Sequence, residues 1–339
     1  MTQQNIYVSE ISYSKGKEVF ERLSAETDFS FVSVPECESS LAKLIKENSV
    51  KGYIADVYSY TGDLYESMPA GSAISRFGVG HDSIDKEKAT AAGIHVANTP
   101  GVLNTSVKEQ AMWMIGSLAR NVPSLDRSMR ANQWSPIKGV EVKGKTLAIL
   151  GFGRIAQDIC KSAHYGFGMN VVGFDQYTEA EFCKFSNVES FEDFQKEVPV
   201  SRITTDLTEA VKDADFVLMM MAVTPETVGL ANDKLFALMP AHSYFLNTAR
   251  GALVNENDLY DALSNGAIAG AAVDVFIEEP YQPQDVNRDL RTLENIVMTP
   301  HVASNTAETN AAMAEVSAHN VMTILSEGAG ACPNIVNPF

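Results

Sequence analysis

Three side chains with complementary chemistry follow one another along the second half of the sequence: Arg250, Glu279 and His301. Each lies close to a short apolar run of the kind that forms β-strands. A guanidinium can bind a carboxylate, an imidazole can exchange a hydroxyl proton, and a second carboxylate can hold that imidazole and stabilise its charged form. A small 2-oxo or 2-hydroxy acid needs these three groups when it is reduced or oxidised. The series therefore indicates an enzyme.

A nucleotide-binding turn precedes these three residues. The apolar run Thr146–Leu150 leads into Gly151–Ala156, a G-x-G-x-x-A pattern that predicts a strand, a tight turn and a helix. Gly151 permits the turn, Gly153 lets the backbone approach a pyrophosphate, and the helix N-terminus offers unpaired N–H groups to its charge. Ala156 replaces the usual third glycine and is still small enough for close helix–strand packing. Taken alone, this pattern could also be a structural turn.

Asp175 makes the nucleotide assignment specific. It follows the next apolar run, Asn170–Phe174, and lies 22 residues after Gly153, where a carboxylate can accept the ribose hydroxyls. A carboxylate at this place also repels a 2′-phosphate, and neither Gln176 nor Tyr177 supplies a positive charge. The sequence therefore predicts NAD as the cofactor rather than NADP.

Length and composition limit the possible functions. The 339 residues suggest about two domains, and 45% hydrophobic with 20% charged residues is an ordinary globular composition. The net charge of −17 argues against nucleic acid as a partner and means that an anionic substrate needs a local cation such as Arg250. No run of about 18 apolar residues exists, so no membrane span is expected. The start of the sequence lacks the features of a secretory signal, which predicts a cytoplasmic location.

The cysteines do not form a recognisable metal or disulfide pattern. They are scattered, without a C-x-x-C pair, at Cys37, Cys160, Cys183 and Cys332. We expect reduced, structural thiols and assign no metal ligand.

Short β-like runs alternate with helical stretches nearly throughout, the pattern of a parallel α/β protein. The strands expected in a first unit are Ile6–Val8, Phe29–Val34, Tyr53–Val57, Ala73–Phe77 and Ile94–Ala97. The strands expected in a second unit, which opens at Gly144, are Thr146–Leu150, Asn170–Phe174, Phe216–Met221, Ser243–Asn247, Ala269–Val273 and Ile296–Met298.

Two long helices and one insertion complete the predicted organisation. A helix from about Ser106 to Arg120 is apolar on one side, and Trp113 and Met114 widen that side, so we expect burial on more than one face. The last helix, from about Ser304 to Leu325, precedes the stop signal Gly328 and is expected to fold back onto the first unit. Between the two, residues 176–205 look like an irregular insertion.

The sequence resembles the D-isomer-specific 2-hydroxyacid dehydrogenase family over nearly its whole length. The motifs that carry the resemblance, in order, are Phe77–Asp85, Asn98–Val102, Gly151–Ile155, Thr224–Thr227, Asn247–Gly251, Gly270–Phe276 and Thr299–His301. The resemblance implies two Rossmann-like domains with a cleft between them. A flavodoxin-like substrate domain would comprise residues 1–104 and 302–339, and an NAD-binding domain residues 105–301. It also implies a homodimer, with the 106–120 helix at its surface.

The resemblance implies a role for each of the three residues named first. Arg250 would bind the carboxylate and carbonyl of a small 2-oxo acid, His301 would be the acid/base, and Glu279 would be its partner. The position of Glu279 directly before Pro280 distinguishes it from Glu278. NADH would deliver a hydride to the 2-oxo carbon while His301 protonates the oxygen, and the reverse reaction would oxidise the D-hydroxy acid.

The cofactor and substrate contacts are implied in the same way. Residues expected at the cofactor are Gly151, Gly153, Arg154, Ile155, Asp175, Thr248, Ala249 and Asp274. Of these, Asp274 would contact the nicotinamide carboxamide. Backbone N–H groups around Gly78, Val79 and Gly80 would hold the substrate carboxylate from the first domain.

Two departures from the family pattern affect the surroundings of the cofactor. Met220–Ala222 stands where the family often has a His/Cys-x-Pro segment, which leaves that loop undefined. Val302–Ser304 replaces the common I-G-G after the histidine and could alter the pocket near the nicotinamide.

Alternatives to a 2-hydroxyacid dehydrogenase stay open. Formate enzymes usually have glutamine at the position of Glu279, and phosphite enzymes have lysine at that of Val79; this sequence has neither. A dinucleotide-sensing regulatory protein, like the transcriptional corepressors of this fold, would bind NADH tightly but reduce no 2-oxo acid. Substrate identity would depend on side chains of the first domain, namely Tyr58, Ser59, Arg76 and Val79. Arg76 could contact a second anionic group of the substrate, or it could pair with an acid, which is the preferred reading.

Overall fold

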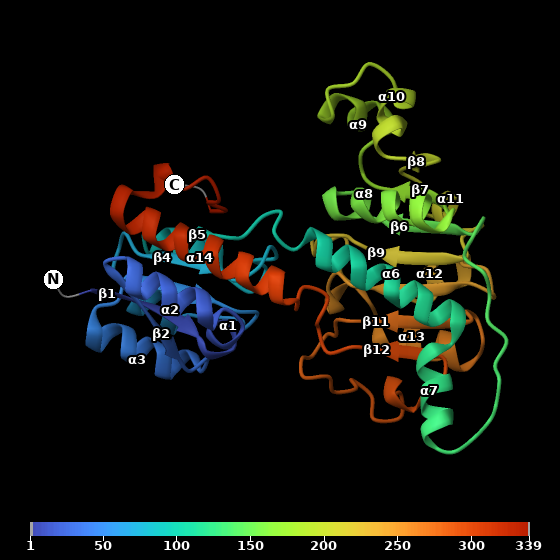
Figure 1. Cartoon of the computed structure of the whole chain (residues 1–339), viewed down its shortest axis with the longest axis horizontal. Helices are drawn as coiled ribbons and strands as arrows, with labels where there is room; N and C mark the ends of the chain where they lie inside the picture. Colours follow the sequence, from blue (N-terminus) through green and yellow to red (C-terminus); the bar gives the residue numbers. More distant parts are fainter. Residues whose placement is uncertain (1–2, 338–339) are drawn as a thin grey trace. The chain divides into compact units, whose positions relative to one another are not determined.

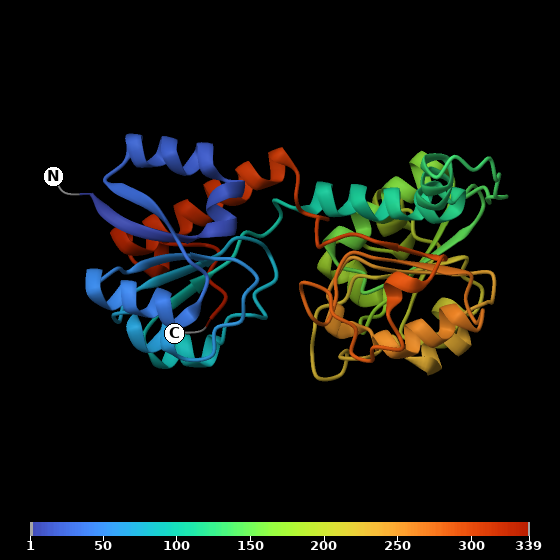
Figure 2. The ribbon, with the colours of Figure 1, turned by 90° about the horizontal axis from the view of Figure 1, so that it is seen from below.

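Two separate parallel sheets organise residues 3–337, which are the residues that the computed structural model describes (Figure 1, Figure 2). The first unit consists of the chain up to Leu103 together with the chain from Ser304 onward, and the second unit is Asn104–Ala303. The predicted α/β fold with two parallel sheets is therefore confirmed.

The first unit has a five-stranded sheet in the order β2-β1-β3-β4-β5, the flavodoxin-like arrangement. Its strands are β1 (Gln4–Ser9), β2 (Phe29–Val34), β3 (Gly52–Ala55), β4 (Ala73–Arg76) and β5 (His95–Ala97). Its helices are α1 (Glu10–Lys15), α2 (Lys17–Glu26), α3 (Glu38–Asn48), α4 (Asp63–Ser67), α5 (Lys86–Ala91) and α14 (Ala307–Glu327). β3 and β4 are buried along their whole length, as expected for a parallel sheet covered on both faces.

Helix α14 returns to the first unit, as predicted. It packs on β3 and β4, and Figure 1 shows it in red beside the β4 label. A Cβ at Gly52 of β3 would lie 2.7 Å from Cγ1 of Val321, so glycine permits this close approach. Thr306 caps the start of α14, and Gly328, with a φ of 90°, ends it.

The second unit has a seven-stranded sheet in the order β12-β11-β10-β9-β6-β7-β8. Its strands are β6 (Thr146–Leu150), β7 (Asn170–Phe174), β8 (Arg202–Thr204), β9 (Phe216–Met219), β10 (Tyr244–Asn247), β11 (Gly270–Val273) and β12 (Ile296–Met298). The first strand in the chain, β6, pairs with β7 on one side and β9 on the other. The strand order reverses there, and open α/β sheets bind ligands beyond the carboxyl ends of the strands at such a point.

The helices of the second unit cover this sheet. They are α6 (Asn104–Arg120), α7 (Val122–Arg130), α8 (Arg154–Lys161), α9 (Glu179–Phe185), α10 (Phe191–Glu197), α11 (Leu207–Val211), α12 (Asp233–Leu238) and α13 (Glu256–Ser264). The short helical segments are η1 (Ser162–Gly166), η2 (Gly251–Leu253) and η3 (Leu290–Thr292). The apolar side of α6 is buried as predicted, and Met114 widens it. Trp113 is 68% exposed, so the same prediction is wrong for Trp113.

The prediction of an irregular insertion at residues 176–205 is also wrong. This segment forms α9, α10 and the edge strand β8. Thr178 and Glu181 make a capping box at the start of α9, and the Ser190 side chain caps α10. One buried phenylalanine from each helix, Phe182 and Phe194, joins the hydrophobic core.

Two further expectations concern the cysteines and a membrane span. All four cysteines are free thiols, buried except for Cys37. None of the helices within residues 3–337 combines the length and apolar character that crossing a bilayer requires.

Candidate functional site

The carboxyl ends of three neighbouring strands of the second unit carry the chemically active side chains. Arg250 follows β10, Asp274 directly follows β11, and His301 follows β12. These strands lie side by side in the sheet order β12-β11-β10, and parallel strands end at the same edge. The sheet thus brings together residues that are far apart in sequence.

His301 and Glu279 form a hydrogen-bonded pair. Nδ1 of His301 lies 2.7 Å from Oε2 of Glu279, and each side chain is 29% exposed. Burial raises the pKa of Glu279, but the hydrogen bond and charge of His301, the N–H of Phe276 and the charge of Arg250 together outweigh it, so this pKa is lower than usual. Because Nδ1 faces the carboxylate, Nε2 of His301 is the ring nitrogen left to exchange a proton with another molecule.

Asp274 fixes the turn that carries His301. Its carboxylate is fully buried and accepts the N–H groups of Val302, at 3.0 Å, and Ala303, at 2.8 Å, as well as the Thr299 hydroxyl. The His301 N–H donates to the Asp274 carbonyl at 2.7 Å. His301 has a φ of 52°, in the left-handed region that non-glycine residues rarely adopt. The surrounding bonds hold this backbone in place, and the nicotinamide contact implied for Asp274 stays a prediction.

Asn247 shapes the turn before Arg250. Its side-chain amide accepts from the Ala249 N–H at 3.0 Å and donates to the Arg250 carbonyl at 2.8 Å. Nη1 of Arg250 donates to the Ala249 carbonyl at 2.7 Å, and the side chain is half-buried. The Thr248 hydroxyl lies 3.4 Å from the sulfur of Met220. The guanidinium is therefore held close to the backbone at the end of β10.

Gly251 allows the Arg250 turn and the Glu279 loop to touch. A Cβ at Gly251 would lie 1.9 Å from the carbonyl carbon of Phe276 and 2.4 Å from the N atom of Ile277. Both neighbours are backbone atoms that cannot move aside without moving the loop.

Gly251→Ala is therefore expected to lower the free energy of unfolding by about 3 kcal/mol, as overpacking of a tight contact does. Urea denaturation measures this loss. Gly116→Ala is the matched control in the same unit, because a Cβ there meets no atom within 4 Å. Equal stability of the Gly251 and Gly116 variants would contradict the close contact.

The turn after β6 has the features of a dinucleotide cradle. Gly151 has a φ of 93°, and a Cβ on it would lie 2.8 Å from the Met220 carbonyl group. Gly153 stands at the start of α8 with open space around its Cα, and no side chain caps this helix. Of the next two residues, Arg154 is exposed and Ile155 packs against the core. The uncapped N–H groups and the open space at Gly153 fit a pyrophosphate.

Asp175 lies at the end of β7 and contacts the same turn. Its carboxylate accepts the Phe152 N–H at 2.8 Å and the Tyr177 N–H at 3.3 Å. These bonds orient the side chain while leaving it half-buried rather than enclosed. The carboxylate is thus held beside the turn, where it could accept ribose hydroxyls.

The turn at Gly78, Val79 and Gly80 belongs to the first unit. It follows β4, and the Gly78 N–H donates to the Arg76 carbonyl at 2.9 Å. Asn98 donates its side-chain amide to the Val79 carbonyl at 2.8 Å. The Gly78 N–H is therefore already used within the turn, which leaves the N–H groups of Val79 and Gly80 as the candidate carboxylate donors.

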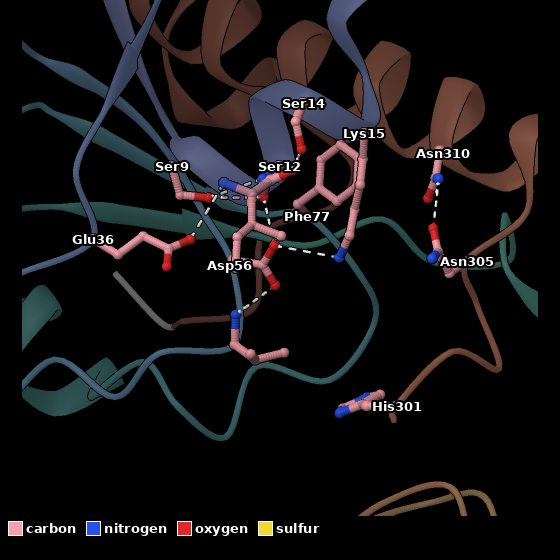
Figure 3. Close-up of polar contacts among 12 residues, drawn as sticks. Ser9, Ser12, Ser14, Lys15, Glu36, Asp56, Phe77, His301, Asn305 and Asn310 are labelled. Atoms are coloured by element: carbon pink, nitrogen blue, oxygen red, sulfur yellow. Dashed lines mark hydrogen bonds and ion pairs between the residues drawn. The ribbon is translucent and has the colours of Figure 1, made fainter. Parts of the chain in front are cut away.

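A charged cluster that the sequence did not reveal surrounds Asp56, directly after β3 (Figure 3). Asp56 is 3% exposed and accepts the Ser12 hydroxyl at 2.9 Å. Lys15 lies 3.6 Å and Arg76 3.9 Å from its carboxylate. Burial raises the pKa of Asp56, but the charges of Arg76 and Lys15, helped by hydrogen bonds from Ser12 and the Val57 N–H, outweigh it and lower this pKa. Arg76 is thus paired with an acid, the preferred of its two sequence-based readings.

Comparison with known proteins gives one family. Residues 112–303 match the family described as D-isomer specific 2-hydroxyacid dehydrogenase, NAD binding domain. The chain is 37% identical over 267 residues to a D-3-phosphoglycerate dehydrogenase of Methanocaldococcus jannaschii, a match that covers 78% of this chain and 48% of that relative. It is 35% identical over 284 residues to a glyoxylate reductase of Thermococcus litoralis, which covers 81% of this chain and 80% of the relative.

Comparison with solved structures finds chains of the same fold over nearly the whole length. The TT0316 protein of Thermus thermophilus superposes with a TM-score of 0.82 at 28% identity, covering 98% of this chain and all of the other. An NADPH-dependent glyoxylate/hydroxypyruvate reductase of Sinorhizobium meliloti gives a TM-score of 0.81 at 25% identity, covering 98% of each chain.

Proposed function

This chain belongs to the D-isomer specific 2-hydroxyacid dehydrogenase family, and from that premise we propose that it interconverts a small 2-oxo acid and its D-2-hydroxy acid with NAD. The relatives are named dehydrogenases and reductases, and the chain is an oxidoreductase of that class with a nicotinamide dinucleotide cofactor. The observation that carries the proposed reaction is the His301–Glu279 hydrogen bond at the edge of the sheet where Arg250 also lies.

The residues divide the proposed chemistry between them. When bound, the cofactor would supply the hydride for C2 of the 2-oxo acid, or take up the hydride that C2 of the 2-hydroxy acid loses on oxidation. His301 would give the substrate oxygen its proton from Nε2 during reduction and take it back during oxidation. Glu279 would stabilise the imidazolium form between turnovers, and Arg250 would bind the substrate carboxylate and stabilise the negative charge that develops on the oxygen.

Besides Arg250, we assign substrate contacts to the first unit, residues 1–104 with 302–339 in the sequence-based division. The N–H groups of Val79 and Gly80 would bind the carboxylate. Since Arg76 is paired with Asp56, we do not assign to Arg76 the binding of a second anionic group on the substrate. A small monocarboxylic 2-oxo acid, such as glyoxylate, hydroxypyruvate or pyruvate, therefore fits better than a phosphorylated or dicarboxylic one.

A spectrophotometric assay of NADH oxidation tests this function. The substrates are glyoxylate, hydroxypyruvate, pyruvate, 2-oxoglutarate and longer 2-oxo acids. Turnover of a small monocarboxylic acid is the expected result. Tight NADH binding without turnover of any 2-oxo acid would instead favour the dinucleotide-sensing regulatory protein.

Cofactor choice is the second part of the proposal, and Asp175 supports NAD. The named relatives include an NADPH-dependent reductase, so the family does not determine the choice. Asp175→Ala removes the charge that would repel a 2′-phosphate, and the ratio of kcat/KM for NADH to that for NADPH is expected to fall roughly tenfold or more. Glu189→Ala removes an exposed acid of the same unit and should leave the ratio unchanged. An unchanged ratio in the Asp175 variant would contradict the assignment.

We also propose a homodimer, formed through α6 and the segment that follows it up to β6. Residues 131–145 have no helix or strand there. The large apolar side chains exposed in this region are Trp113, Val122, Met129, Trp134, Ile137 and Val140. Trp134 is 85% exposed, more than any other large apolar side chain among the described residues. Such a concentration of apolar surface is typical of protein–protein interfaces.

Light scattering after gel filtration tests the dimer. The wild type is expected at about twice 36.8 kDa. The double variant Trp113→Ala/Trp134→Ala is expected at the monomer mass, because interface energy concentrates in buried aromatic side chains. Phe185→Ala, which removes an exposed aromatic ring of α9, should remain dimeric. A monomeric wild type would contradict the proposed homodimer.

For the compartment, we propose the cytoplasm. The free, mostly buried thiols suit a reducing environment.

A further inference from the structure

A buried carboxyl group with no role in the chemistry above lies behind the Glu279 loop. Glu256 is the first residue of α13 and is 5% exposed. Its Oε1 accepts the N–H of Ile277 at 2.8 Å. Its Oε2 is buried and has no hydrogen-bond partner among the described residues. A half-satisfied buried carboxyl is costly to a fold, so its presence needs an explanation.

The bond to Ile277 places Glu256 in contact with the loop that carries Glu279. The loop has two backbone N–H groups fixed by carboxylates: that of Ile277 by Glu256, and that of Phe276 by Glu279 itself at 2.9 Å. Gly251 packs against the peptide between Phe276 and Ile277. The position of this peptide determines the position of the Glu279 backbone two residues later. Glu256 holds the peptide through its hydrogen bond to the Ile277 N–H.

We propose that Glu256 is a positioning residue: by accepting the Ile277 N–H, its buried carboxyl sets the loop that holds Glu279 against His301. The proposal rests on the function proposed above for Glu279 and His301. Glu256 does not touch the reacting groups. It acts on the 2.7 Å bond between Glu279 and His301 through the loop backbone.

The charged groups around the loop indicate which property of Glu256 matters. Burial raises the pKa of Glu256 and the Ile277 N–H lowers it, while the nearby charges of Glu278 and Glu279 raise it further. For Glu279, burial raises the pKa, and His301 and Arg250 are among the groups that lower it. The pKa values of the two carboxyls are thus shifted in opposite directions, that of Glu279 down and that of Glu256 up. Glu279 keeps its charge to pair with His301, whereas Glu256 is needed as a hydrogen-bond acceptor and not as a charge.

Two substitutions separate these properties. Glu256→Gln keeps an acceptor oxygen at the same distance from the backbone and removes the ability to ionise. Glu256→Asp keeps the carboxyl but is one methylene shorter, so it withdraws the acceptor from Ile277. Glu278→Gln is the control, because it removes an exposed charge of the same loop without touching the anchor.

Kinetics and histidine NMR are measured on the full chain. Glu256→Asp is expected to lower kcat about tenfold to a hundredfold, with KM within about threefold, because a small misplacement affects the reacting geometry more than binding. The titration midpoint of His301, assigned by comparison with His301→Asn, should differ from that of the wild type because the imidazole loses part of its contact with Glu279. Glu256→Gln and Glu278→Gln should stay within about threefold of the wild-type kcat.

Two outcomes would overturn the proposal. The first is a folded Glu256→Asp variant with the wild-type His301 midpoint. The second is Glu256→Gln as impaired as Glu256→Asp, since this would mean that the oxygen acceptor is not what matters. If Glu256→Asp does not fold, hydrogen exchange at the Ile277 amide is measured in Glu256→Gln instead. Protection of this amide as in the wild type supports the role of Glu256 in holding the loop. Lost protection with an unchanged His301 midpoint refutes that role. The His301 midpoint needs no turnover, so it tests the anchor even if no 2-oxo acid is reduced.

Discussion

His301→Ala is expected to lose most of its turnover, by about 10³-fold, while NADH binding survives. A positioned general acid/base contributes about 10²–10⁴-fold to a rate, and Nε2 of His301 is the atom left for proton exchange once Nδ1 faces Glu279. The cofactor turn at Gly151 and Gly153 lies on a different strand, β6, so its N–H groups are not altered. Steady-state kcat and NADH fluorescence titration measure the two effects.

A surface histidine provides the control for this variant. His164 is exposed on η1, and His164→Ala should keep wild-type kcat. Retained turnover in His301→Ala would remove the acid/base assignment. Loss of NADH binding together with turnover would instead mean that the substitution had disturbed the sheet edge as a whole.

Arg250→Ala is expected to lower kcat/KM by about 10³-fold or more, again with NADH binding retained. The guanidinium is proposed both to bind the substrate carboxylate and to stabilise the oxyanion, and removing a single oxyanion donor costs about 10²–10³-fold in kcat. The net charge of −17 makes the loss more severe, because the rest of the protein repels an anionic substrate. Kinetics against glyoxylate and hydroxypyruvate measure it.

Arg250→Lys tests whether geometry or charge matters at this position. Lysine keeps the positive charge but lacks the planar fork that binds a carboxylate through two parallel hydrogen bonds, so it should recover only part of the loss. Arg130→Ala removes an exposed arginine of α7 and should have no effect on kcat/KM. An Arg250→Ala variant with wild-type KM and kcat would mean that another group binds the substrate.

The strands and the cofactor turn could be predicted because their signals are local. In a parallel sheet the inner strands are buried on both faces, so β6 and β7 appear in the sequence as apolar runs with the bounds that the structure has. The turn at Gly151 needs a backbone of positive φ next to the Met220 carbonyl group, which restricts it to glycine. Such positions are visible without knowledge of the rest of the fold.

The errors occurred where tertiary packing decides. Helices α9 and α10 are seven residues each, too short for a clear period, and they depend on the burial of Phe182 and Phe194. Trp113 resembled a core residue by composition, but its position on α6 faces away from the core and leaves it exposed.

The groups that support the candidate site were the least predictable from sequence. The histidine–carboxylate pair was expected from motif resemblance, but its supports are contacts between distant residues. Glu256 reaches Ile277 across 21 residues of chain, and Asp56 reaches Ser12 across 44. A carboxylate at the start of a helix or the end of a strand has an ordinary local explanation, and only the fold shows what it contacts.

The first unit is built from two separated stretches of chain, which has a consequence for its synthesis. The ribosome completes β1 to β5 first and then makes the whole second unit before it reaches α14. Until then, the apolar residues of β3 and β4 that α14 covers have no helix over them. The second unit is continuous and can begin to fold as it emerges. During synthesis, the apolar surface of the first unit is therefore the part of the nascent chain most prone to aggregate, because α14 covers it last.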